Sequence, residues 1–144
     1  MYHNILVPLD GSARAEKILP HIEELALKFE AVVLFLNVIE PADKITPEAV
    51  VKDMREQEQK ITPYLAEVQE NFQKKGIRTE SRILHGPVVD GIIGTARKEN
   101  VDLIAIASHG RTGMGQLFYG SIAAGVLNKV DRPLLIIRSR QEGF

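Results

Sequence analysis

The stretch LIAIASHGRTGMGQLFYGSIAAGVLNKV, residues 103–130, decides the fold. It begins with the continuously apolar run Leu103–Ala107, passes through a glycine-rich segment and ends in apolar residues at helical spacing. A continuously apolar run is typical of a strand that is covered on both faces, as the strands of parallel sheets are. The stretch therefore predicts a strand, a glycine-rich loop and a helix in direct succession.

Short apolar runs recur along the chain and predict four more strands. They lie at Ile5–Val7, Val32–Val38, Ser81–Leu84 and Leu134–Ile137. Charged Glu80 and Arg82 flank and interrupt the third of these runs, so we expect that strand at an edge of the sheet.

Apolar residues at helical spacing predict helices between the strands. Three such stripes lie at residues 15–29, 88–96 and 122–130. The longer stretch between the second and third strands contains Thr46-Pro47 and Thr62-Pro63, each a capping residue before a proline that suits the first helical position. It predicts either two helices or one helix kinked near Thr62, with Gly76 as the stop.

The alternation of strands and helices predicts the fold class. Such an order implies right-handed crossovers between parallel strands, with helices on both faces of the sheet. We expect an α/β protein with a single open five-stranded parallel sheet, Rossmann-like, in one domain that spans residues 1–144.

Composition excludes several classes of function. The chain has no cysteine, which excludes disulfides, zinc–thiolate sites and cysteine nucleophiles. A net charge of −1 gives no electrostatic case for binding nucleic acid or an acidic membrane. No apolar run reaches the roughly 20 residues that span a bilayer, and Met1–Pro8 lacks the pattern of a signal peptide. We therefore expect a cytoplasmic protein.

Two loops are candidate binding sites, because ligands of open α/β sheets bind beyond the carboxyl ends of the strands. The loop after the first strand contains Asp10, Gly11 and Ser12. Asp and Ser are common helix caps, so by itself this loop is most simply a helix-entry turn. Asp10 nevertheless stands where its carboxylate or its backbone would face a ligand.

The loop after the fourth strand predicts a phosphate-binding site. It contains four glycines and leads into the helix that begins near Ser121. Glycines let backbone N–H groups approach an oxyanion closely, and the start of a helix adds free N–H groups and a positive dipole end. The hydroxyl of Ser121 can donate to a phosphate, and Arg111 either adds a cation or points to solvent. A merely flexible loop is the alternative, and the position of the glycines between strand and helix favours phosphate binding.

Histidines give no catalytic or metal site. His109 has no carboxylate partner in the sequence, so a role in ordering the loop is the better interpretation. The other three histidines show no metal-ligand spacing. We predict no catalytic residue and no protein-built metal site.

Several segments together resemble the universal stress protein family, over essentially the whole chain. They are Ile5–Ser12, Asp102–Ile104 leading into Ser108–Arg111, Gly120-Ser121, and Arg132–Ile137. The nucleotide-binding branch of that family carries a glycine, two residues, a second glycine, nine residues, and a glycine followed by Ser or Thr. Gly110, the nine residues after it and Gly120-Ser121 match this pattern, whereas Ala107 stands at the position of the first glycine.

The resemblance implies a site for an adenine nucleotide, ATP or AMP. The residues implied are Pro8, Leu9, Asp10, Val38, Ala107, Gly110, Arg111, Gly113, Gly120, Ser121 and Ile122. The backbone around Asp10 and Val38 would frame the adenine. Pro8 and Ala107 would lie near the ribose, and Gly110 with residues 120–122 would hold the phosphates. Arg111 and Gly113 would shape that phosphate loop.

The resemblance also implies an ion and a partner. The ion is Mg²⁺, held mainly by phosphate oxygens and water. The partner is a second copy of the chain, paired through Leu134–Ile137 across a two-fold axis, although an ordinary sheet strand would have the same apolar sequence.

The function that these observations favour is a nucleotide-binding regulatory protein of the stress response, with an unknown protein partner. The glycine loop lacks the lysine of a Walker loop, so we expect at most slow ATP hydrolysis, with Asp10 and His109 as weak candidates. One alternative is a dimeric interaction protein that binds no nucleotide. Another is an ATP-pyrophosphatase or nucleotidyl-transfer enzyme of the adenine nucleotide α-hydrolase type, whose phosphate signature in the first loop is missing here.

Overall fold

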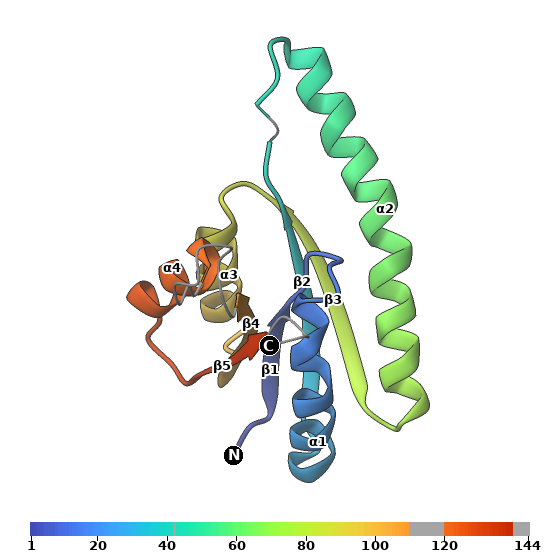
Figure 1. Cartoon of the computed structure of the whole chain (residues 1–144). Helices are drawn as coiled ribbons and strands as arrows, with labels where there is room; N and C mark the ends of the chain where they lie inside the picture. The colour runs from blue at the N-terminus through green and yellow to red at the C-terminus, as the bar shows by residue number, and fades with distance from the viewer. Residues whose placement is uncertain (42, 110–119, 140–144) are drawn as a thin grey trace, which may run out of the picture.

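Five parallel strands form one sheet in the computed structural model, which describes residues 1–41, 43–109 and 120–139. The strands run in the order β3-β2-β1-β4-β5, so β1 is central and β3 lies at an edge, as predicted (Figure 1). Their bounds are β1 (Asn4–Pro8), β2 (Val32–Ile39), β3 (Arg78–His85), β4 (Leu103–His109) and β5 (Leu134–Ser139). In register, Ile5 of β1 stands between Val33 of β2 and Leu103 of β4.

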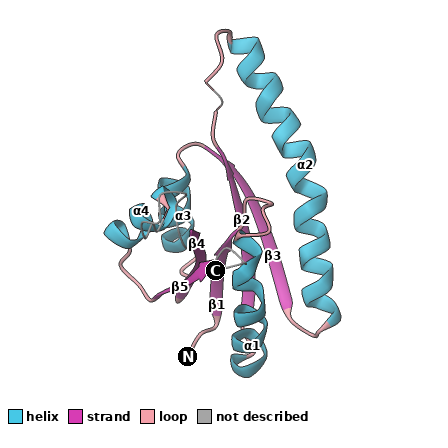
Figure 2. Cartoon of the chain, viewed as in Figure 1, coloured by secondary structure: helices cyan, strands magenta, loops and turns pink. Residues whose placement is uncertain are grey.

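Helices cover both faces of this sheet, which confirms the predicted α/β fold class (Figure 2). Their bounds are η1 (Ala15–Ile18), α1 (Leu19–Phe29), α2 (Pro47–Lys74), α3 (Val88–Lys98) and α4 (Ser121–Lys129). Side chains of α1 and α2 share one buried cluster with the sheet, and side chains of α3 and α4 share another. None of the helices within the described ranges is long and apolar enough to cross a membrane.

Strand β2 is apolar at every position except Asn37, and its packing explains why. Val33 and Phe35 belong to the cluster on the α1 and α2 face, whereas Leu34 and Leu36 belong to the cluster on the opposite face. The ring of Phe35 meets that of Phe72 edge-on, with centroids 5.0 Å apart. Since successive side chains of a strand point to opposite faces, burial of both faces favours apolar residues at nearly all positions.

Helix α2 settles the question that the two Thr-Pro pairs left open, because it is one helix with Pro63 inside it. Thr46 caps its start, and the Thr46 side-chain oxygen accepts a hydrogen bond of 3.1 Å from the Ala49 N–H. Thr62 does not cap a second helix; its hydroxyl donates to the Glu58 carbonyl at 2.8 Å, which is an ordinary contact within a helix. Gly76, at φ +84°, follows the last turn as predicted.

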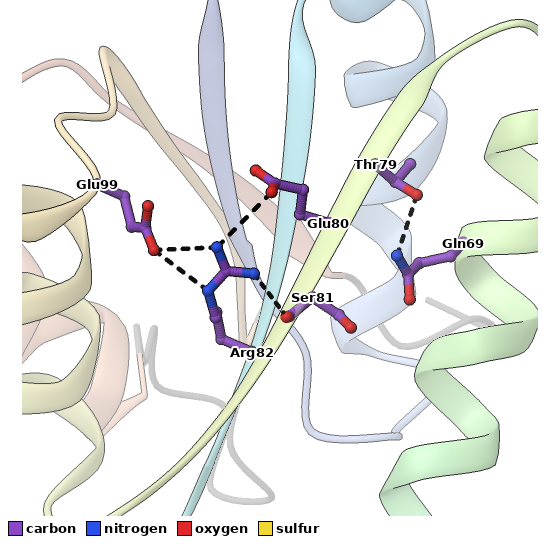
Figure 3. A network of polar contacts seen from close by, with 6 residues as sticks. All are labelled: Gln69, Thr79, Glu80, Ser81, Arg82 and Glu99. Carbon is purple, nitrogen blue, oxygen red and sulfur yellow. Dashed lines mark hydrogen bonds and ion pairs between the residues drawn. The ribbon is translucent and has the colours of Figure 1, made fainter.

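Polar contacts tie the edge strand β3 to the helices on both faces (Figure 3). Arg82 Nε donates to a Glu99 carboxylate oxygen at 3.2 Å, next to the end of α3. On the other face, Gln69 of α2 donates to the Thr79 hydroxyl at 3.2 Å. The charges of Glu80 and Arg82 that interrupt the apolar run thus belong to an edge that is only partly covered.

Two further polar groups hold the amino ends of the central strands. The Asp102 carboxylate accepts hydrogen bonds from the backbone N–H groups of His3 and Asn4, at 2.9 and 3.2 Å. The Arg132 guanidinium donates to the carbonyls of Ala96 and Val101, at 2.7 and 2.9 Å. The Asp102 contacts fix the start of β1 to the start of β4, and the Arg132 contacts fix the segment before β5 to the connection between α3 and β4. Because the strands are parallel, their carboxyl ends lie at the opposite edge of the sheet.

Candidate functional site

A cavity of about 350 Å³ lies at the carboxyl edge of the sheet. Its walls come from the ends of β1, β2 and β4, from the loop after β1, and from the first turns of α3 and α4. The strand order reverses here, because β1 has β2 on one side and β4 on the other. This is the place at which open α/β sheets bind ligands.

The predicted binding residues that the structure describes all line this cavity. They are Pro8, Leu9, Asp10, Val38, Ala107, Gly120, Ser121 and Ile122. The remaining three, Gly110, Arg111 and Gly113, lie outside the described residues, as does the side chain of His109. The sheet therefore brings together two loops that are about a hundred positions apart in the sequence.

The loop after β1 is the helix-entry turn that its sequence predicts, and it is also a wall of the cavity. The Asp10 carboxylate accepts a hydrogen bond of 2.9 Å from the Ser12 N–H, and the Ser12 hydroxyl oxygen accepts one of 3.1 Å from the Ala15 N–H. Gly11 between them has φ +87°, a conformation that favours glycine. Asp10, Ser12 and Ala15 all line the cavity, so capping and exposure to a ligand coexist in this loop.

The buried side chain of Asn37 holds this loop against β2. Its amide donates to the Leu9 carbonyl at 2.8 Å, and the Leu9 N–H donates to the Leu36 carbonyl at the same distance. The protein's own hydrogen bonds thus fix the backbone of the loop after β1 against the end of β2. Sequence reasoning missed Asn37, because an asparagine inside an apolar run has no motif to identify it.

The first turn of α4 forms the opposite wall. Its N-cap is Gly120, at φ 80° and ψ 146°, and no side chain among the described residues caps it. The first N–H groups of a helix have no partner within the helix, and the dipole makes this end positive. Since Gly120, Ser121 and Ile122 all line the cavity, this wall is suited to an anion.

Ser108, at the end of β4, was not predicted as a site residue. It is only 2% exposed, it lines the cavity, and its hydroxyl has no hydrogen-bond partner among the described residues. Its sequence neighbours Ala107 and His109 belong to the predicted loop, but only the three-dimensional arrangement shows that the Ser108 hydroxyl has no partner within the described ranges.

Carboxylates lie on the β1 and β2 side of the cavity. Asp10 follows β1, and Glu40 follows β2 and accepts a hydrogen bond of 3.3 Å from the Val88 N–H at the start of α3. Behind the same loop, burial raises the pKa of the Tyr64 hydroxyl, and the carboxylates of Glu16 and Asp10 raise it further. Among residues 1–41, 43–109 and 120–139, no group of three or more His, Cys, Asp or Glu side chains is arranged to hold a metal ion.

Comparison with known proteins agrees with this architecture. A model of the universal stress protein family matches residues 1–138. Universal stress protein MJ0577 of Methanocaldococcus jannaschii is 28% identical over 158 residues, which cover 97% of each chain. A solved structure of MJ0577 has a TM-score of 0.76 to this chain and covers 99% of both.

Two further solved structures share the fold at lower identity. Universal stress protein UspA from Lactobacillus plantarum has a TM-score of 0.84 at 20% identity, covering 95% of this chain and 98% of its own. The universal stress protein from Archaeoglobus fulgidus in complex with dAMP has a TM-score of 0.67 at 24% identity, covering 94% and 98%. Because the family model spans nearly the whole chain, this protein belongs to the universal stress protein family.

Proposed function

We propose that this protein binds an adenine nucleotide, ATP or AMP, in the cavity at the carboxyl edge of the sheet. The observation that carries the proposal is the first turn of α4, which has a glycine N-cap and lines a cavity of about 350 Å³. Ligand pockets are commonly about 300–1,000 Å³, so the size suits a small molecule. The dAMP complex of the relative from Archaeoglobus fulgidus supports an adenine nucleotide as the class of ligand.

The two sides of the cavity suggest how the nucleotide lies. In this proposal the phosphates would lie at Gly120, Ser121 and Ile122, where helix N–H groups and the Ser121 hydroxyl could donate to an anion. The adenine would lie between the backbone near Asp10 and Val38, and the ribose would lie near Pro8 and Ala107. Gly110, Arg111 and Gly113 are proposed to complete the phosphate loop.

Magnesium is proposed to accompany the nucleotide rather than to occupy a site built by the protein. Mg²⁺ commonly binds phosphate oxygens and keeps several waters. On the α4 side the cavity offers helix N–H groups, which bind phosphate oxygens and have no lone pair for a cation. The ion would therefore be held through the nucleotide.

The biological role that we propose is regulation in a stress response, in the cytoplasm, by one domain spanning the chain. Nucleotide occupancy would bias the conformation or the partners of the protein, with at most slow hydrolysis. We also propose a homodimer through Leu134–Ile137, since β5 ends the strand order and carries four consecutive apolar residues that are only half-buried.

Calorimetry with ATP, AMP and GTP tests the proposal, and a pair of glycine variants gives it a control. Gly120→Asp places a negative charge at the proposed phosphate site, and we expect it to abolish binding. Gly76→Asp makes the same change at a similar φ, +84°, where a Cβ meets nothing within 4 Å. Both variants carry the same kind of backbone strain, so binding by Gly76→Asp alone supports the proposal. Wild-type protein that binds neither ATP nor AMP at millimolar concentration would refute it.

A further inference from the structure

The hydroxyl of Ser108 is buried and lacks a hydrogen-bond partner within the described part of the chain. The side chain is 2% exposed, so water does not reach it freely. A buried hydroxyl without a hydrogen bond destabilises a protein relative to an apolar side chain of the same shape. Such a group is explained when a ligand supplies the missing partner.

Most side chains around the Ser108 hydroxyl are apolar. Successive side chains of a strand alternate between faces, so Ser108 shares with Ile106 the face covered by α3 and α4. Leu36, Ile92 and Ile122 form the apolar part of the cavity wall on this face, and the start of α4 adds Ser121. A few polar groups among apolar side chains fix the orientation of a bound ligand by directed contacts.

The charge distribution of the cavity identifies the ligand atom. Carboxylates of Asp10 and Glu40 lie on the β1 and β2 side, whereas the first turn of α4 lies on the side of β4, to which Ser108 belongs. A hydroxyl that lines the same cavity as a positive helix end is suited to donate to an anionic oxygen bound there. We propose that Ser108 Oγ donates a hydrogen bond to a phosphate oxygen of the bound nucleotide, and so distinguishes nucleotides from nucleosides.

This inference rests on the proposed function and is tested with two ligands that differ only in phosphate. AMP and adenosine are titrated into the wild type, Ser108→Ala and Ser81→Ala, with NMR used for millimolar Kd values. Ser81 is the matched control, since it is a strand serine on the edge strand β3 and does not line the cavity. For Ser108→Ala we expect AMP to bind roughly 10- to 100-fold more weakly, the range for a hydrogen bond to a charged group. Adenosine affinity should change by less than about twofold, because only the phosphate contact is lost.

The unfolding temperature without ligand is a second measurement. A purely structural role of Ser108 would change it in the opposite direction from the ligand-binding role proposed here. Without ligand, Ser108→Ala should unfold at the same temperature as the wild type or at a higher one, because it removes an unpaired buried hydroxyl. A clear loss of stability without ligand would overturn the inference and give Ser108 a structural role. Equal affinities of wild type and Ser108→Ala for AMP would overturn it too, as would equal losses for AMP and adenosine. In those cases the proposed function stands, whereas wild-type protein that binds no nucleotide refutes both.

Discussion

Replacement of Gly91 by alanine tests the contact between α3 and β2 that forms one corner of the cavity. A Cβ built at Gly91 would lie 2.8 Å from Val38 Cγ2 and 3.1 Å from Val38 Cγ1. Valine is branched at Cβ and stiff, so rotation about χ1 only exchanges one close methyl group for the other. Either α3 or the end of β2 must therefore move.

A second glycine in the same helix provides the control. Gly94 lies one turn further along α3, and a Cβ there meets nothing within 4 Å. Both substitutions gain about 1 kcal/mol of helix propensity. Only Gly91→Ala adds overpacking, which costs roughly 1–3 kcal/mol. The difference between the two variants thus isolates the contact with Val38.

We expect Gly94→Ala to be more stable than the wild type by about 1 kcal/mol. Gly91→Ala should be about 1–3 kcal/mol less stable than Gly94→Ala, a difference of roughly 3–12 °C in Tm for a chain of this size. Urea unfolding followed by far-ultraviolet circular dichroism measures both, and the slope m should not change. Because Val38 lines the cavity, AMP affinity should fall in Gly91→Ala only. Equal stabilisation by the two alanines would refute the reasoning.

Three further substitutions address the polar contacts. Arg132→Met removes the guanidinium donor of the Val101 carbonyl, whereas the Ala96 carbonyl keeps the backbone N–H of Val101, and urea unfolding should show a loss of about 1–3 kcal/mol; an unchanged midpoint would contradict this. Asp102→Asn removes one of two acceptors for the N–H groups at the start of β1, and should cost about 1 kcal/mol in the same assay while nucleotide binding is retained. Tyr64 has a raised pKa in the folded protein, because of burial first and of the Glu16 carboxylate second. The unfolded chain therefore loses this proton first, above about pH 10, and stability declines from there as pH rises. Between about pH 8 and pH 11, the free energy of unfolding should fall less in Tyr64→Phe than in the wild type. An equal fall in both proteins would show that Tyr64 does not cause the loss of stability.

The sequence was sufficient for the fold because the predicted strands other than the edge strand are apolar on both faces. Val32–Val38 and Leu103–Ala107 have no polar face to place toward water, which leaves a sheet covered by helices on both sides. The long stretch before β3 was ambiguous for a local reason. A capping residue followed by proline is typical of a helix start. Thr62-Pro63 has this pattern, but it lies inside α2, which continues through it.

The parts of the candidate site that the sequence predicted are those in which neighbouring residues of one loop together indicate binding. Gly120-Ser121 combines a glycine N-cap with a helix start, and Asp10 ends the first strand. Ser108, Asn37 and Glu40 were missed, because each depends on a partner distant in the sequence or on the lack of one. Periodicity shows which face of an element is buried, but not which buried polar atom is left for a ligand.

The two edges of the sheet differ in a way that limits self-assembly. At one edge, β3 alternates charged Arg78, Glu80 and Arg82, a composition that discourages another strand from adding there. At the other, β5 presents Leu134–Ile137. Pairing through β5, as proposed above, would occupy that edge in both copies, so strand addition would stop at a closed pair and would not continue into a fibre.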